Sequence, residues 1–331
     1  MKRNQKRGMS IQYLCRQCSS SFTVNYSHNK ISSKDFTNLH LDGVSFRKVG
    51  KRIGSSGVAI FKRTQEYFRK LTTNMELTIK YADMYKYSGY LVVDGTYIAV
   101  KGHPRKLVLI WGIDYLTHDV PHYIIGGAEN YQTMLAYFKR LELLEYNLRY
   151  LVCDDNEAIK MVAIKIYPRV IIQTCLKHYR ESIRRDLGLK TSNCYLGFYL
   201  EIDKLFTKRL CNVEVAWAVQ KLYPRFKNDP RCVNWLTDIM QRKDELTNYH
   251  MFENTPNTTN LIEAYNSHLK GRLKTIKGFK SLTSMKLWVN AYIVKRRLSD
   301  FTSCDTKFKH LNGMCSLKKV LKSDQKLPQL F

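Results

Sequence analysis

Asp94 interrupts an apolar stretch that is typical of a buried strand, Leu91-Val92-Val93-Asp94-Gly95-Thr96-Tyr97-Ile98. A carboxylate in such a strand is costly to bury unless it is paired or holds a metal ion. Asp94-Gly95 is also a turn dipeptide, so the strand could end there. The strand pattern continues directly through Thr96–Val100, however, and this favours a buried ligand over a turn.

Two further acidic residues lie at the edges of ordered segments. Asp154 ends the run Tyr150–Cys153, and Asp155 beside it competes for the same role. Asp155 is well placed to cap the helix that follows, which leaves Asp154 over the carboxyl edge of the sheet, where α/β proteins bind ligands. Glu263 lies in the first turn of a helix, where it could instead form a capping box with Asn260. Carboxylates on two strands and one helix can jointly hold Mg²⁺.

The order of the apolar segments predicts an α/β fold. Strands are expected at about 90–101, 106–116, 120–126, 149–153 and 169–174, and helices at 130–146, 156–166 and 177–187. This order is that of a ribonuclease H-like fold, a five-stranded mixed sheet with helices on both faces. Residues 190–250 have a mainly helical pattern, which predicts a helical insertion.

The net charge of +27 is concentrated at the two ends of the chain. Residues 1–75 contain 15 Lys and Arg against 3 Asp and Glu, residues 264–331 again contain 15 against 3, and the middle is nearly neutral. Clustered positive charge favours a polyanionic partner such as nucleic acid. No signal peptide or membrane-length apolar run is evident, and the nine cysteines are scattered. We therefore expect a soluble, intracellular protein without disulfides.

Residues 32–75 predict three short helices. Ser33, Ser45 and Ser55-Ser56 can cap them, and Gly54 makes a tight turn before the third, which is the layout of a helix-turn-helix. The predicted DNA contacts are Arg47, Lys48, Lys51, Arg52, Ser56, Lys62 and Arg63. A basic helical bundle without DNA contact is the alternative.

A second basic row follows Glu263 on its helix. Lys270, Lys274 and Lys277 are spaced i, i+4 and i+7 on one face, and Arg272 lies between them. Such a row could follow a phosphate backbone, although a solvated helix face would have the same pattern.

Two short cysteine motifs remain. Cys175-Leu176-Lys177-His178 follows the fifth strand, but Cys175 and His178 alone do not complete a zinc site, which normally takes four ligands. Cys15 and Cys18 form half of a zinc ribbon, with His28 as a third candidate ligand, so zinc binding there stays open.

Taken together, these segments resemble the DDE transposases of prokaryotic insertion sequences, in particular the mutator-like group. The matching segments are Asp94–Ile98 with Val100–Gly102, Val152–Asp155, Tyr167-Pro168, Gln173–His178, Asn260–Glu263 with Asn266, and Arg272–Lys274 with Gly278-Phe279. The resemblance covers residues 10–300. The chain departs from the family in its missing zinc half-site and in Asp155, where a small residue is usual.

The resemblance implies a ribonuclease H-like catalytic core in which Asp94, Asp154 and Glu263 are the catalytic residues and hold two Mg²⁺ or Mn²⁺ ions. The expected domains are a basic segment with a zinc-ribbon remnant (1–30), a helix-turn-helix (31–75), the first part of the core (76–187), a helical insertion (188–255), the core helix with basic helices (256–302) and a loosely held basic tail (303–331).

The implied function is cleavage and strand transfer of double-stranded DNA, with element ends and target DNA as substrates. Because two ends must be processed together, we expect at least a dimer on DNA, in the cytoplasm at the nucleoid and without a membrane partner. One alternative is an inactive or domesticated DNA-binding protein derived from a transposase. Another is a ribonuclease H-type enzyme acting on RNA–DNA hybrids.

Overall fold

The computed structural model describes residues 2–7, 10–25, 32–276 and 278–331. The chain divides into two compact units, one formed by residues 1–70 with Phe331 and the other by residues 71–330. The first unit contains a small sheet and three helices, and the second contains a larger sheet with its own helices. Within the described ranges, no helix is both long and apolar enough to cross a bilayer.

The first unit begins with a three-stranded antiparallel sheet. Its strands are β1 (Lys2–Arg7), β2 (Ser10–Leu14) and β3 (Ser21–Asn25), paired in sequence order. Tyr13 and Phe22 face each other across β2 and β3, with ring centroids 5.6 Å apart. The sequence predicted only a basic, turn-rich segment here. These strands escaped prediction because none of their described side chains is fully buried, so the apolar alternation is weak.

Three short helices follow, as the sequence predicted. They are α1 (Ser33–Leu41), α2 (Phe46–Ile53) and α3 (Gly57–Lys70). The N-cap of α1 is Ser32 rather than the predicted Ser33, and its side chain accepts a hydrogen bond from Asp35 N. Ser45 caps α2 as expected.

The core of this helical cluster takes one residue from each helix, namely Phe36, Val49 and Ile60, and all three are buried. Gly54 ends α2 in the left-handed region at φ 66°, which favours glycine. The chain can therefore turn sharply into α3. The three helices and the turn at Gly54 are present, and the helix-turn-helix assignment remains a prediction.

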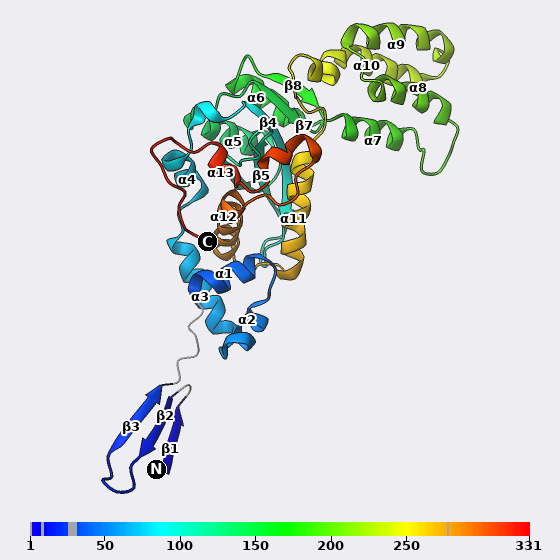
Figure 1. Cartoon of the computed structure of the whole chain (residues 1–331). Helices are drawn as coiled ribbons and strands as arrows, with labels where there is room; N and C mark the ends of the chain where they lie inside the picture. The colour runs from blue at the N-terminus through cyan, green and yellow to red at the C-terminus, as the bar shows by residue number, and fades with distance from the viewer. Residues whose placement is uncertain (1, 8–9, 26–31, 277) are drawn as a thin grey trace. The chain divides into compact units, whose positions relative to one another are not determined.

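The second unit is built on a five-stranded mixed sheet. Its strands are β4 (Tyr90–Ile98), β5 (Leu107–Asp114), β6 (Tyr123–Gly126), β7 (Tyr150–Cys153) and β8 (Ile171–Thr174). The strand order is β6-β5-β4-β7-β8, with antiparallel pairing on the β6 side of β4 and parallel pairing on the β8 side. This α/β arrangement is compatible with the expected ribonuclease H-like fold (Figure 1).

The second unit also contains helices, several of which flank this sheet (Figure 1). The longer ones are α4 (Asn74–Tyr81), α5 (Tyr131–Leu143), α6 (Glu157–Ile166), α7 (Leu176–Asp186), α8 (Leu196–Thr207), α9 (Asn212–Phe226), α10 (Pro230–Thr247), α11 (Asn260–Ile276) and α12 (Leu282–Leu298). The short ones are η1 (Met84–Lys86), η2 (Asn248–His250), η3 (Thr306–Leu311) and α13 (Ser316–Lys319). Because these helices cover the sheet, its central strands are almost continuously apolar.

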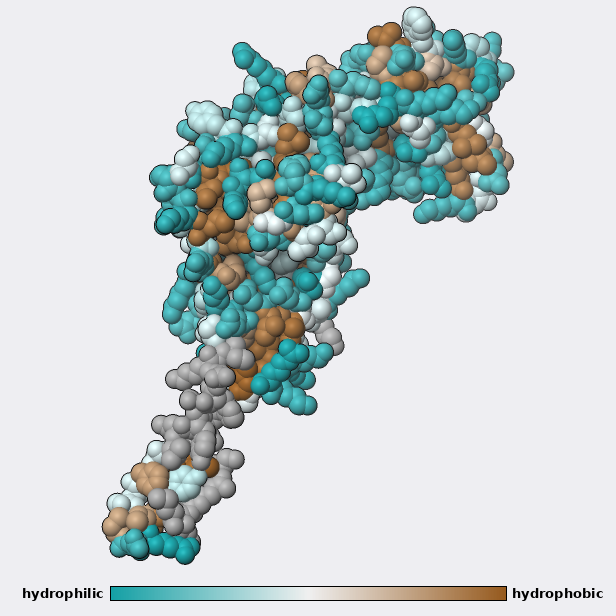
Figure 2. All heavy atoms as spheres, in the orientation of Figure 1, coloured by the Kyte–Doolittle hydropathy of each residue, from teal (hydrophilic) through white to brown (hydrophobic). Residues whose placement is uncertain are grey.

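Helices α7 to α10 pack around one apolar cluster. Its members include Tyr179, Ile183, Ile202, Val215 and Ile239. Helices α8 to α10 fall within the predicted helical insertion, residues 188–255, whereas α7 was assigned to the core by sequence yet shares this cluster. The bundle also exposes apolar side chains, and brown patches lie over α8 and α9 in Figure 2.

Residues 306–322 pack within the second unit. The sequence predicted a loosely held tail over residues 303–331, and this prediction is wrong for residues 306–322. Leu317 and Val320 have no solvent exposure, and a β-bridge joins Leu321 to Ala82. The apolar residues interspersed among the lysines provide enough buried surface to hold the segment in place.

A buried ion pair joins distant parts of this unit. Arg297 in α12 and Asp119, in the turn after β5, both have 0% side-chain exposure. The guanidinium Nε and Nη2 lie 2.9 and 2.6 Å from the two carboxylate oxygens, so the pair is bidentate. Nη1 donates to Asn74 Oδ1 at 2.8 Å and to Thr78 Oγ1 at 2.7 Å, both in α4.

The Asp119 carboxylate has further donors. It accepts hydrogen bonds from the hydroxyls of Tyr87 at 2.6 Å and Ser316 at 2.7 Å. Burial acts to raise the pKa of Asp119, but the Arg297 charge and these hydrogen bonds hold it below its ordinary value. The same turn is fixed to α11, because the Tyr265 hydroxyl donates to His118 O at 2.9 Å.

Replacing Arg297 by Met tests this ion pair. We expect Arg297→Met to lower the free energy of unfolding by about 3–5 kcal/mol, because Asp119 is left charged and buried without its partner. The measurement is urea denaturation followed by circular dichroism. Glu181→Gln is the control, since Glu181 and Arg184 are exposed (45% and 52%) and such pairs contribute about 0–1 kcal/mol. Equal, small losses in both variants would contradict the prediction.

Candidate metal centre

The register of the parallel strands β4 and β7 places Asp94 and Asp154 side by side. Val92 in β4 pairs with Val152 in β7. Asp94 and Asp154 each lie two residues further along the chain, and neighbouring strands are about 4.8 Å apart. Two carboxylates from distant parts of the sequence therefore meet at one edge of the sheet.

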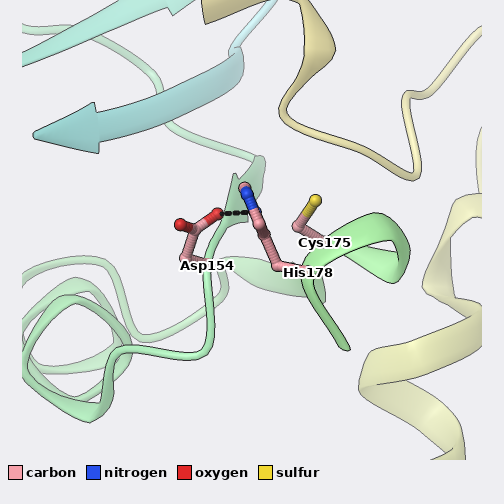
Figure 3. A group of neighbouring side chains, drawn as sticks. All are labelled: Asp154, Cys175 and His178. Carbon is pink, nitrogen blue, oxygen red and sulfur yellow. Dashed lines mark ion pairs between the residues drawn. The ribbon is translucent and has the colours of Figure 1, made fainter. Parts of the chain in front are cut away.

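Cys175 and His178 lie at the same edge. Cys175 follows β8 directly, and its amide donates to Cys153 O at 2.9 Å, which places it next to Asp154. His178 lies in the first turn of α7, and its Nδ1 is 2.5 Å from Asp154 Oδ1 (Figure 3). One ligand atom from each of Asp154, Cys175 and His178 lies within 4.8 Å of the others. This group could hold a metal ion.

The start of α11 brings Glu263 into the same place. The Thr259 hydroxyl lies 3.1 Å from Glu263 Oε1 and 3.4 Å from Asp154 Oδ1, so it can donate to either carboxylate. His178 lies between the same two acids, with Nε2 3.6 Å from Glu263 Oε1. The capping box considered for Asn260 is not the arrangement seen, because the helix already includes Asn260 and Glu263 N bonds to Thr259 O at 3.0 Å.

Asp94 is held from two sides. Its Oδ1 accepts from Gly95 N at 2.7 Å, and its Oδ2 accepts from Asn266 Nδ2 at 2.6 Å, one turn along α11 from Glu263. Asn266 is itself held in place, because its Oδ1 accepts a hydrogen bond from Trp111 Nε1 at 3.0 Å. Trp111 is the residue of β5 that pairs with Asp94. Burial, and then the nearby charge of Asp154, raise the pKa of Asp94 to about 7.

Two cationic side chains of the chain itself balance the acids. The hydrogen bond to Asp154, followed by that to Cys175, raises the pKa of His178 to about 10. Lys177 Nζ lies 2.5 Å from Glu263 Oε2. Burial acts to raise the pKa of Glu263, but hydrogen bonds from Lys177 and Thr259 more than offset it and hold the pKa below its ordinary value. The acids are therefore already paired with positive charge.

Glu129 is a fourth carboxylate at this edge that the sequence did not single out. It lies in the turn before α5, and it packs against Gly95 so closely that a Cβ there would lie 2.0 Å from Glu129 Oε1. Burial raises the pKa of Glu129, although a hydrogen bond from Tyr97 opposes the shift, and the charge of Asp154 adds to it. The sequence does contain a hint of Glu129, because the residue follows Gly126-Gly127 and precedes a helix. An acidic residue in such a turn does not by itself indicate a metal ligand.

Asp155 faces away from the candidate centre. Its carboxylate binds Lys160 at 2.6 Å and takes two hydrogen bonds from Arg242 in α10, at 2.6 and 2.9 Å. It is not the cap of α6 that the sequence allowed, because Asn156 caps that helix through Ala158 N. Of the two adjacent acids, Asp154 is the one that lies beside His178 and Thr259.

The predicted DNA-contacting residues are spread over both units. Those in the first unit are all exposed, namely Arg47, Lys48, Lys51 and Arg52 on α2, Ser56 just before α3, and Lys62 and Arg63 on α3. On α11, Lys270 and Lys274 are exposed and Arg272 is half-buried. Lys277 lies outside the described residues.

Cys15 and Cys18 lie at the turn between β2 and β3. Cys15 N donates to Ser20 O at 2.9 Å, and hydrogen bonds from Ser20 lower the pKa of Cys18 to about 7. In the described part of the chain, no third His, Cys, Asp or Glu completes a metal-binding group with them. His28, considered as a third ligand, lies outside the described residues.

No protein-family model matches this sequence. No curated protein matches it either. The resemblance to DDE transposases therefore remains a prediction from the sequence segments alone.

The pKa of Asp94 predicts how ion binding depends on pH. A bound cation must displace the Asp94 proton, so we expect Mn²⁺ affinity to rise from about pH 5.5 to about pH 7.5, by up to about tenfold per unit below pH 7. Isothermal titration calorimetry with Mn²⁺ measures this. Asp94→Asn should bind more weakly and lose most of this pH dependence. An affinity that is flat over the same range in the unmodified protein would contradict the assignment.

Proposed function

We propose that this chain is a DDE-type transposase that cuts DNA at the ends of its own element and joins it to target DNA. The observation that carries the proposal is the meeting of Asp94, Asp154 and Glu263 at one edge of a mixed sheet. The three acids come from β4, from the end of β7 and from the first turn of α11. Separate structural roles would not require Asp154 and Glu263 to share the partners Thr259 and His178, or Asp94 to bind Asn266 one turn beyond Glu263.

Asp94, Asp154 and Glu263 would together hold the two Mg²⁺ or Mn²⁺ ions that the proposed reaction requires. Carboxylate oxygens are the ligands that these hard cations prefer. When bound, such ions activate the attacking water or 3′-hydroxyl and stabilise the oxygen that leaves the phosphodiester. Glu129 adds a further carboxylate on the Asp94 side.

The surrounding residues orient these ligands. Asn266 and Gly95 N fix the Asp94 carboxylate, and the Thr259 hydroxyl can align either Asp154 or Glu263. His178 supplies positive charge between the latter two acids. Held in this way, the ligands need little rearrangement before catalysis.

Cys175 is better explained as a support than as a ligand. Thiolate and imidazole would select a softer ion such as Zn²⁺, which normally takes four protein ligands in a structural site. The Cys175 residue has no solvent exposure, and its sulfur accepts a hydrogen bond from Thr259 N at 3.3 Å and lies 3.2 Å from Thr259 Oγ1. We therefore assign Cys175 the role of holding Thr259 in place. A structural zinc site normally takes four protein ligands, so zinc at Cys15 and Cys18 would need two further ligands.

The proposal includes DNA binding by both units. Helices α1 to α3 would act as a helix-turn-helix for the element ends, with the basic residues of α2 and α3 on phosphates and bases. On α11, Lys270, Arg272 and Lys274 follow Glu263 along the helix, so this helix can contact the DNA backbone beside the cleavage site. Because two ends must be joined, we propose at least a dimer on DNA, acting at the nucleoid.

A strand-cleavage assay tests the activity. With Mn²⁺ or Mg²⁺ and DNA that carries the flanks of the gene, we expect nicking, and we expect Asp94→Asn and Glu263→Gln each to lower its rate by more than about 100-fold, because a metal ligand is lost. Glu157→Gln is the matched control, since the Glu157 side chain is 75% exposed on α6. Its rate should equal that of the unmodified protein.

The same assay separates the alternatives. Salt-sensitive DNA binding without any metal-dependent nicking would favour a DNA-binding protein derived from a transposase. Faster cleavage of RNA–DNA hybrids than of duplex DNA would favour a ribonuclease H-type enzyme. Full activity in Asp94→Asn would contradict the catalytic assignment.

The helix-turn-helix assignment predicts a change in salt dependence. If Lys62 contacts a phosphate, Lys62→Ala should reduce the slope of log K against log salt concentration by about 0.9, because one fewer counterion is released. Fluorescence anisotropy with labelled end DNA measures the slope. Lys221→Ala, at an exposed position of α9, should leave it unchanged. Identical slopes for Lys62→Ala and the unmodified protein would remove Lys62 from the interface.

A further inference from the structure

Lys177 lies beside the acidic edge and pairs with Glu263. Its Nζ is 2.5 Å from Glu263 Oε2, and the two side chains are 54% and 28% exposed. The backbone that carries Lys177 is fixed, because the neighbouring Leu176 is buried and its amide donates to Asn257 O at 2.9 Å. Lys177 is therefore a long side chain on a fixed anchor.

Glu263 cannot bind Lys177 and a divalent cation equally well through the same carboxylate. An exposed Lys–Glu pair is weak, because it is screened by solvent and costs side-chain entropy. A divalent cation held by several carboxylates is bound more strongly. Cation binding at Glu263 therefore releases the Lys177 ammonium group.

The released ammonium group stays beside the acidic edge, because its backbone is fixed there. The Lys177 charge interacts with Asp154 and with the Cys175 thiol, besides Glu263. Asp154, however, belongs to the same ligand set. Among the described residues, Lys177 forms an ion pair with Glu263 alone. In the proposed reaction a DNA phosphate must approach this same edge, where it would meet the released ammonium group.

We infer that Lys177 occupies two positions: it pairs with Glu263 in the metal-free protein and binds a phosphate at the cleavage site once Glu263 holds a metal ion. This inference rests on the proposed function. Lysine suits the second position, because its flexible stem carries a compact charge that binds phosphate from many directions. There, the ammonium group stabilises the negative charge that develops on the phosphoryl oxygens during cleavage. Lys177 is then a catalytic residue, and it also competes with metal binding in the absence of DNA.

These two roles predict effects of opposite sign. Removing the Lys177 charge should strengthen metal binding, because Glu263 loses its competing partner. It should weaken DNA binding and slow cleavage, because the phosphate loses a cation. A lysine that only stabilised the fold would not produce this combination.

The first test measures Mn²⁺ binding to the full-length protein without DNA, by calorimetry. We expect Lys177→Met to bind Mn²⁺ about fivefold more tightly than the unmodified protein. Lys204→Met is the matched control, since Lys204 is 55% exposed and pairs with Glu201, which is 31% exposed, at 3.2 Å. Its Mn²⁺ affinity should not change. Equal or weaker Mn²⁺ binding by Lys177→Met would overturn the inference.

The second test measures DNA binding as a function of salt. With Ca²⁺ present, we expect Lys177→Met to lower the slope of log K against log salt concentration by about 0.9. With a chelator in place of the metal, the slope should match that of the unmodified protein, because Lys177 is then paired with Glu263. If Lys177→Met changed the slope equally in both conditions, or in neither, the proposed contact between Lys177 and a phosphate would be overturned.

The third test measures cleavage at saturating metal concentration. We expect Lys177→Met to be at least about tenfold slower than the unmodified protein, and Lys177→Arg to recover part of the rate, because it keeps the charge. A rate for Lys177→Met equal to that of the unmodified protein would overturn the catalytic role. If the unmodified protein does not cleave DNA at all, the proposed function fails, whereas the two binding tests still decide where Lys177 lies.

Discussion

The bidentate pair between Arg297 and Asp119 is the interaction on which the second unit depends. Both groups are completely buried, and a lone charge at that depth is not tolerated, so each requires the other. Through this pair, α12, α4 and the turn after β5 are held as one body, and Ser316 adds the segment near the chain end. The same turn accepts a hydrogen bond from Tyr265 of α11. The helix that carries Glu263 is therefore also fixed to the turn that contains Asp119.

At that edge the fold resolves an electrostatic conflict. Bringing several carboxylates together in a partly buried place is unfavourable unless positive charge accompanies them. Here the chain supplies it, since His178 contacts Asp154 and Lys177 contacts Glu263. The two side chains act as internal counterions. In the proposed function, a bound cation would displace Lys177, whereas His178 would remain beside Asp154.

Much of the fold, and several residues of the acidic edge, could be predicted from the sequence. The features that could not be predicted have physical reasons. Asp94 could be singled out as a candidate ligand, because a carboxylate within an apolar strand has few structural roles. The order of the apolar segments predicted the mixed sheet. Glu129 was not recognisable, because its place depends on the absence of a side chain at Gly95, a contact between distant segments. The strands β1 to β3 bury too little to produce a strong pattern. The prediction of a loosely held tail rested on the many lysines of this segment. Leu317 lies among them, and its burial depends on contacts with distant parts of the chain, which the sequence does not show.

Asp154 and Asp155 are adjacent along the chain but have different partners. Asp154 faces the acidic edge, whereas Asp155 is bound by Arg242 of α10 and by Lys160, which also pairs with Glu245 of α10. A single peptide bond thus links the helical bundle to a proposed metal ligand. The ion pairs of Asp155 with α10 therefore restrain the stretch of backbone that carries Asp154.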